Sequence, residues 1–243
     1  AKYAKFDINK ILERLLVKGS IVVKKAYCDW ERYRDFKATM HGAAFELIDI
    51  PHVRQSGKNS ADIRMVVDAL DLCYTKLHVN TFVIISGDSD FSPLVSKLRE
   101  NAKTVIGVGV KNSTSDLLIS NCDEFIFYDD LVREQERSQQ PAKSTKTRRK
   151  RKAKATPKKD KAQEGIDIAL ETARALNAER GDSGKLWGSM VKQTLKRRRP
   201  GFSESAYGFS SFSELLEEAR ERGQITLELD ERSGGYILKS LDH

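Results

Sequence analysis

One stretch, TFVIISGDSDFSP at residues 81–93, constrains the fold of this chain more than any other. Five apolar or β-branched residues in succession predict a strand that is buried on both faces, as in a parallel sheet. Ser86 and Gly87 end this strand, and Asp88 and Asp90 follow directly. Ligands of open α/β sheets bind outside the carboxyl ends of the strands, so these two acids occupy a position where chemistry is expected.

Strand and helix patterns alternate along residues 1–134. Strands are expected at 21–28, 45–50, 81–86, 104–110 and 124–128, and helices at about 3–16, 31–41, 61–77, 92–101 and 115–120. This alternation is typical of βαβ units and predicts an α/β fold with a parallel sheet. Because such a series normally begins with a strand and this one begins with a helix, we expect a further strand just before Ala1.

The segment 61–77 predicts an amphipathic helix with Ser60 as its N-cap. At about 100° per residue, its apolar side chains form one stripe that we expect to face the sheet. The stripe consists of Ile63, Val66, Val67, Leu70, Cys73, Tyr74 and Leu77. Asp62 lies at the edge of this stripe and can join a site beside the sheet, whereas Asp68 and Asp71 point away and are interpreted as solvated surface acids.

Three carboxylates from separate segments, Asp62, Asp88 and Asp90, are expected to converge at the strand ends. Oxygen ligands of this type suit Mg²⁺ or Mn²⁺, which bridge phosphate oxygens and activate water for phosphodiester cleavage. The loop before the helix offers Lys58 and Asn59 for contact with phosphates. The alternative is that Asp88 and Asp90 form only an acidic turn that caps the helix beginning near residue 92.

The net positive charge of the chain comes from one short segment. Residues 1–135 contain equal numbers of basic and acidic residues, whereas residues 136–163 contain 12 Lys or Arg and 2 Asp or Glu. This segment has almost no large apolar residues, so we expect a disordered basic linker at 135–163. Such a linker attracts RNA or DNA phosphates through counterion release. A merely solvated spacer is the alternative.

Residues 164–243 predict a second, smaller domain. Helical patterns centre on residues 166–176, 186–199 and 211–222, and two short strands at 224–229 and 236–239 are joined by a glycine turn. Three helices and a hairpin outline a winged helix. The basic cluster Lys196–Arg199, with Phe202 and Tyr207 nearby, is the expected contact with RNA, although the net charge of −2 over residues 164–243 leaves room for a protein partner.

The spacing of the cysteines and histidines indicates neither a disulfide framework nor a zinc site. Cys28, Cys73 and Cys122 are widely spaced in apolar contexts, which favours free buried thiols over disulfides or zinc ligands. The histidines show no metal-ligand spacing. No apolar run approaches the roughly 20 residues that cross a bilayer, so we expect a cytoplasmic protein without a membrane contact.

The motifs of the first domain resemble those of the NYN domain, a PIN-like ribonuclease family. The residues that carry the resemblance are Ser86–Phe91, Lys58–Asp62 and Ala26–Trp30. The resemblance implies a Rossmann-like sheet with helices on both faces and Mg²⁺- or Mn²⁺-dependent cleavage of RNA, with Asp62, Asp88 and Asp90 at the positions of the family's acids. The family's first acid stands in an Asp-x-x-Asn motif that is absent here, and we expect that motif upstream of Ala1.

The second domain resembles the LOTUS, or OST-type helix-turn-helix, domain. The resemblance rests on Gly184–Ser189, Leu195–Phe202, Tyr207–Phe209 with Phe212, and Gly235–Leu238. It implies an RNA-binding winged helix attached to an NYN domain.

These observations predict a metal-dependent endoribonuclease whose linker and C-terminal domain hold RNA. Asp62, Asp88 and Asp90 are the expected catalytic and metal-binding residues, and the expected RNA contacts are Lys58, Asn59, Ser86, Arg148, Arg149, Lys150, Arg151, Lys152, Lys196, Arg197, Arg198 and Tyr207. The rival hypothesis is a non-catalytic RNA-binding adaptor with a vestigial acidic pocket. The linker disfavours a small-molecule phosphatase, and DNA stays open as a substrate because phosphate contacts do not distinguish it from RNA.

Overall fold

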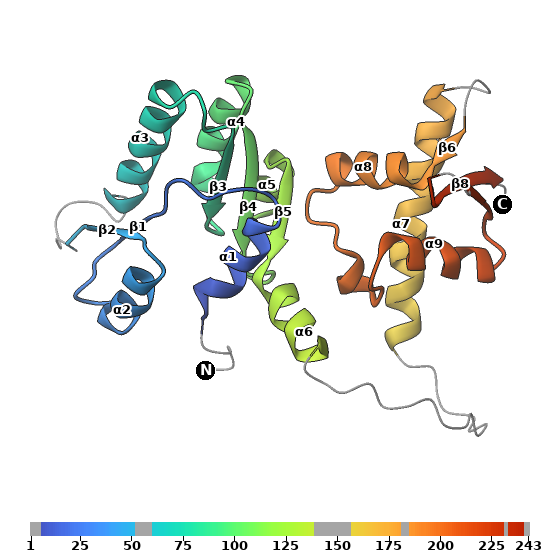
Figure 1. The fold of residues 1–243 in the computed structure, drawn as a ribbon, viewed down its shortest axis with the longest axis horizontal. Helices are drawn as coiled ribbons and strands as arrows, with labels where there is room; N and C mark the ends of the chain where they lie inside the picture. Colours follow the sequence, from blue (N-terminus) through green and yellow to red (C-terminus); the bar gives the residue numbers. More distant parts are fainter. Residues whose placement is uncertain (1–5, 52–59, 139–156, 181–184, 231–232, 241–243) are drawn as a thin grey trace. The chain divides into compact units, whose positions relative to one another are not determined.

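A computed structural model describes residues 6–51, 60–138, 157–180, 185–230 and 233–240. The chain divides into two compact units, the first made of residues 1–122 and 126–132 and the second of residues 123–125 and 133–243 (Figure 1). Each unit is described by itself.

The first unit alternates helices and strands, as the sequence predicts. Its elements are α1 (Ile8–Leu16), β1 (Lys25–Cys28), α2 (Arg34–Gly42), β2 (Glu46–Asp49), α3 (Ser60–Thr75), β3 (Thr81–Ile85), the short 3₁₀ helix η1 (Ser89–Phe91), α4 (Ser92–Glu100), β4 (Thr104–Gly109) and α5 (Asp116–Asn121). β5 (Glu124–Phe127) and α6 (Tyr128–Ser138) follow, and each has residues in both of the ranges that define the units. The strand predicted at residues 21–28 is shorter than expected, because only its last four residues pair with a neighbour.

The larger sheet has the strand order β3-β4-β5, and β3 and β4 are parallel (Figure 1). One face of this sheet packs against α1 and α6 through Ile106 and Val108 of β4, and α4 packs beside the same strand. Val105 and Val108 are fully buried, and each contributes about 1.5–3 kcal/mol relative to an exposed side chain. The central strand within the described residues is therefore β4, whereas β3 lies at the edge and Ile85 is 41% exposed.

The smaller sheet pairs β1 with β2 in parallel, with Tyr27 opposite Ile48. Trp30 closes its carboxyl end, because the indole Nε1 donates to the Ile48 carbonyl at 3.1 Å and the Trp30 amide donates to Asp49 at 3.0 Å. The ring is 4% exposed, so this turn has a small core of its own.

The predicted orientation of α3 is wrong. Ile63 and Val67, which were expected to face the sheet, are 62% and 55% exposed, whereas the buried side chains are Ala69 and Cys73. At about 100° per residue, those two lie within about 20° of Asp62 on the helix. The inward face of α3 therefore consists of small residues, which permit close packing, and Asp62 lies in the middle of that face and not at its edge.

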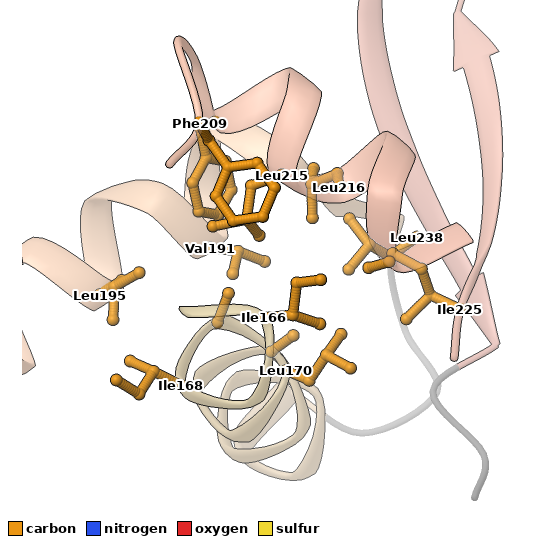
Figure 2. Packing of buried hydrophobic residues seen from close by; sticks show 14 of the residues in the cluster. Ile166, Ile168, Leu170, Val191, Leu195, Phe209, Leu215, Leu216, Ile225 and Leu238 are labelled. Carbon is orange, nitrogen blue, oxygen red and sulfur yellow. The ribbon is translucent and has the colours of Figure 1, made fainter. Parts of the chain in front are cut away.

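The second unit has one core shared by all of its elements. These are α7 (Pro157–Arg180), β6 (Leu186–Trp187), α8 (Gly188–Arg198), η2 (Glu204–Tyr207), α9 (Phe212–Glu221), β7 (Thr226–Asp230) and β8 (Gly235–Ser240). Figure 2 shows side chains from α7, α8, α9 and the strands meeting in this core, among them Ile166, Val191, Leu215 and Leu238. The strands form an antiparallel sheet of order β6-β8-β7.

Two boundaries differ from the prediction. Leu186 and Trp187, which were placed in a helix, form a short strand because they pair with Leu238 and Ile237. Helices α6 and α7 enter the expected linker, 135–163, from both ends, since α6 continues to Ser138 and α7 begins at Pro157. Pro at the first helical position and the Lys, Ala and Gln that follow are compatible with a helix. No helix in the described part of the chain is long and apolar enough to span a membrane.

Candidate active site

The segment after β3 is a tight turn in which one acidic side chain, Asp88, is hydrogen-bonded to the backbone of the turn itself. The Ser86 amide continues the ladder by donating to the Val108 carbonyl at 3.0 Å, and the Ser86 hydroxyl accepts from the Asp88 amide at 3.1 Å. One oxygen of Asp88 accepts from the Asp90 amide at 3.0 Å and caps η1. Asp88 thus caps η1 and not the helix that begins at Ser92, whose N-cap is Phe91 without a side-chain bond. The Asp90 carboxylate has no hydrogen bond or ion pair to any described residue.

Gly87 holds this turn against the loop that follows β4. The Gly87 carbonyl accepts from the Ser115 amide at 3.0 Å. A Cβ placed on Gly87 would lie 2.6 Å from the Ser113 carbonyl oxygen and 3.2 Å from the Thr114 Cα, closer than atoms can pack. Glycine is required here because two backbones meet, and this close approach fixes the direction in which Asp88 and Asp90 leave the sheet.

Asp62, on the first turn of α3, interacts electrostatically with both of these acids. The pKa of Asp62 is raised, first by burial and then by the negative charges of Asp88 and Asp90. The carboxylate on the first turn of α3 thus shares an electrostatic environment with the two that follow β3. Mutual repulsion of this kind is relieved when a cation or a proton enters the site.

The three acids do not form a closed metal cage. Within the described ranges, no group of three His, Cys, Asp or Glu side chains is close enough to hold a metal ion by itself. Their chemistry still fits a hard cation, because Mg²⁺ is commonly held by one or two carboxylates while waters and substrate phosphates complete its shell.

Asp68 is not the solvated surface acid that the sequence predicts. Its carboxylate accepts hydrogen bonds from Lys25 Nζ and the Tyr27 hydroxyl, both at 3.0 Å, and from Arg64 Nε at 3.0 Å. Its side chain is only 11% exposed. Lys25 and Tyr27 belong to β1, so Asp68 anchors α3 to the smaller sheet.

Comparison with known proteins addresses the first unit directly. A family model described as the NYN domain matches residues 1–129, which is more than half of the chain. The chain belongs to the NYN domain family. NYN domains are part of the PIN-like nuclease superfamily, and the parallel α/β sheet is consistent with that fold.

Two similar proteins each match about half of this chain. An uncharacterized protein of Methanocaldococcus jannaschii is 28% identical over 120 residues, which are 49% of this chain and 47% of that protein. A crystal structure of a protein of unknown function from Vibrio parahaemolyticus has 29% sequence identity and a TM-score of 0.47, covering 54% of this chain and 83% of that one. The chain thus spans about half the length of the curated relative it matches.

Several residues expected to contact RNA lie outside the described residues. These are Lys58 and Asn59, which precede α3 in the sequence, and the basic residues 148–152. Their roles stay predictions.

In the second unit, the basic end of α8 has acidic partners of its own. Arg198 and Arg199 pair with the same carboxylate, Glu171 on α7, at 3.1 and 3.4 Å. Arg197 is exposed and has no ion pair to a described residue. Binding of phosphate to Arg198 would therefore compete with Glu171.

Tyr207 is already stacked inside the protein. Its ring lies 5.2 Å from that of Phe202 at an interplanar angle of 22°, and Gly165 of α7 packs against it so closely that a Cβ there would lie 2.7 Å from the Tyr207 Cβ and Cγ. Phe202 itself is buried. These contacts support a structural role for both rings, and contact of Tyr207 with RNA stays a prediction.

Proposed function

We propose that the chain is a metal-dependent endoribonuclease that hydrolyses RNA phosphodiester bonds at the carboxyl end of β3. The observation that supports this most directly is the raised pKa of Asp62, caused by burial and by the charges of Asp88 and Asp90. The charges of Asp88 and Asp90 oppose ionisation of Asp62, and a cation that joined the three carboxylates would relieve this repulsion. Membership of the NYN family supplies the nuclease context.

In this proposal Asp62, Asp88 and Asp90 hold Mg²⁺ or Mn²⁺ together with water. The bound ion would act as a Lewis acid on the phosphate and lower the pKa of a coordinated water. The chain itself places the acids, because the bond from the Asp90 amide to Asp88 and the close approach at Gly87 fix the turn that carries two of them. The exposed Asp90 carboxylate is free to turn toward the substrate.

We further propose that the linker and the second unit bind RNA, with the second unit acting as a LOTUS-like winged helix. The arrangement of helices and an antiparallel sheet in that unit is compatible with this assignment. Lys196, Arg197 and Arg198 would contact phosphates. Because such contacts release counterions, replacing Arg197 by Ala is expected to lower the salt dependence of RNA binding, whereas Lys239→Ala, which removes a cation from β8, serves as the control.

The deciding experiment is cleavage of single-stranded and structured RNA by the full chain in Mg²⁺ and in Mn²⁺. Wild type is expected to cleave, and Asp88→Asn and Asp90→Asn are expected to lose at least about 100-fold in rate, the scale of removing one group that stabilises developing charge. Asp71→Asn, an exposed acid of α3, is the matched control. Equal activity of wild type and Asp88→Asn would refute the proposed nuclease function.

The rival function is a non-catalytic RNA-binding adaptor. The absence of a closed metal-binding group among the described residues favours this alternative. It predicts that RNA binding persists unchanged in Asp88→Asn and that no cleavage is detected with either metal.

A further inference from the structure

A pocket of about 490 Å³ opens beside Asp90 in the first unit. It is lined by Ser89, Asp90, Ser92, Pro93, Ser96 and Leu117, which belong to η1, to the first turns of α4 and to α5. α4 and α5 are in contact with one another and with η1. The pocket therefore begins at the acidic turn and continues along one side of α4.

The polar part of the lining consists of hydroxyl groups. Ser89, Ser92 and Ser96 follow one another at intervals of three and four residues, which places them on one helical face. Ser92 is 6% exposed, and its hydroxyl has no hydrogen-bond partner among the described residues. A buried hydroxyl without a partner is destabilising, and Ser92 is one of the residues that line the pocket.

The charge of the lining excludes a phosphate site. No Lys or Arg lines the pocket, and its one ionisable side chain is the Asp90 carboxylate, which repels anions. The apolar part is Pro93 together with Leu117, whose side chain is 56% exposed. Hydroxyls beside an exposed apolar surface suit a neutral, ring-containing molecule, and the volume falls within the range of about 300–1,000 Å³ typical of small-molecule sites.

We propose that this pocket binds one ribonucleoside of the RNA substrate, next to the phosphate held at the acids. Leu117 and Pro93 contact the base, and the serine hydroxyls exchange hydrogen bonds with the ribose 2′-hydroxyl. A serine matches this group because both donate and accept. DNA lacks the 2′-hydroxyl, so the pocket discriminates RNA from DNA. This inference rests on the proposed function, whose substrate it specifies.

The test is titration of the full chain with adenosine and with 2′-deoxyadenosine, followed by amide NMR without added metal. Adenosine is expected to perturb amides around Ser96 and Leu117 and to bind at least about fivefold more tightly than 2′-deoxyadenosine, the equivalent of roughly 1 kcal/mol for one hydrogen bond. Ser96→Ala should abolish that difference, because its exposed hydroxyl is removed without disturbing the core. Leu117→Ala should weaken both nucleosides, and Ser120→Ala, an exposed serine of α5 outside the pocket, should change neither.

Equal binding of the two nucleosides to wild type, an unchanged ratio in Ser96→Ala, or perturbations confined to other residues would each overturn the proposal. Because no cleavage is measured, these outcomes are independent of the nuclease assay. If wild type cleaves RNA, Asp88→Asn does not, and wild type binds the two nucleosides equally, the proposed nuclease function stands and the nucleoside pocket is refuted. If wild type prefers adenosine but cleaves no RNA, the nucleoside pocket stands and the nuclease function is refuted.

Discussion

Replacing Asp68 with Ala should destabilise the first unit more than any change to an exposed acid of the same helix. Asp68 accepts hydrogen bonds from Lys25 and Tyr27 of β1 at 3.0 Å and from Arg64 at 3.0 Å, and its side chain is 11% exposed. Truncation removes the acceptor and leaves the ammonium and the phenol of β1 partly buried without it.

The magnitude follows from the three contacts. The Arg64 pair joins residues i and i+4 on a mostly exposed side chain and contributes only about 0.3–0.5 kcal/mol. The bonds from Lys25 and Tyr27 involve a charged and largely buried acceptor, and each is of the class that contributes about 1.5–3 kcal/mol. Glu46, 3.7 Å from Lys25, retains part of that ion pair. Because the three bonds share one carboxylate, their contributions do not add in full, and we expect Asp68→Ala to lower the free energy of unfolding by about 2–4 kcal/mol, and Asp68→Asn by about half as much.

The assay is urea unfolding followed by the fluorescence of Trp30, in a background where Trp187 is replaced by Phe so that the signal reports the first unit. Asp71→Ala is the matched control, because Asp71 is an exposed acid one turn further along α3, and its change should stay within about 0.5 kcal/mol. If Asp68→Ala cost no more than Asp71→Ala, the anchoring role of Asp68 would be refuted.

The same contribution should depend on pH. Burial opposes ionisation of Asp68, but the hydrogen bonds from Lys25 and Tyr27 and the nearby positive charges outweigh it and lower the pKa of Asp68. A carboxyl with a lowered folded-state pKa stabilises the fold above its unfolded pKa of about 3.9 and loses this contribution as the pH falls through the folded value. The difference between wild type and Asp68→Ala should therefore be full at pH 7 and shrink below about pH 4.

Three further predictions concern stability and are measured by the same unfolding experiment. Asp62→Asn should raise the free energy of unfolding at pH 7 by a few tenths to about 1 kcal/mol, because it removes a carboxylate whose pKa is raised by burial and like charges. A lower free energy of unfolding would contradict the clustering of acids. Gly87→Ala should cost about 1–3 kcal/mol because a Cβ meets a carbonyl oxygen at 2.6 Å, whereas Gly19→Ala, with nothing within 4 Å, should be tolerated. Gly165→Ala should destabilise the second unit by about 1–2 kcal/mol through overlap with Tyr207, although alanine normally favours a helix; a gain in stability would show that this ring moves aside freely.

The alternation of strands and helices in the first unit could be predicted because each element has a local signature. The run at 81–85 is a strand, and Asp88 and Asp90 follow it as expected. The electrostatic interaction of Asp62 with them agrees with the expectation that parallel strands and their helices bring such ends to one edge of a sheet. That the three acids form one catalytic site stays a prediction. These conclusions needed only periodicity and the direction of the chain.

The orientation of α3 could not be predicted in this way. A helical wheel centres the inward face on the largest apolar residues, but Ile63 and Val67 stay exposed, whereas Ala69, which lies outside the predicted stripe, is buried together with Cys73 at the edge of that stripe. The role of Asp68 depends on Lys25 and Tyr27, which are 43 and 41 residues away in the chain. No local pattern carries that information. The spacing of Ser92 and Ser96 along α4, by contrast, is visible in the sequence. It indicates a binding site only once the structure shows that Leu117 of α5 lines the same pocket.

α3 is the element through which the fold and the candidate site influence each other. Within the described residues, the β1–β2 pair and the β3-β4-β5 sheet share no ladder, and α3 packs against both β1 and α4. Its first turn carries Asp62, which is repelled by the negative charges of Asp88 and Asp90, and this repulsion favours separation of α3 from the turn after β3. Asp68 holds the middle of the helix on β1. Because the repulsion and the anchor act on one helix, the Asp68 contacts oppose the separation that the like charges favour. A cation that joins the acids would therefore stabilise the packing of α3 as well as the site.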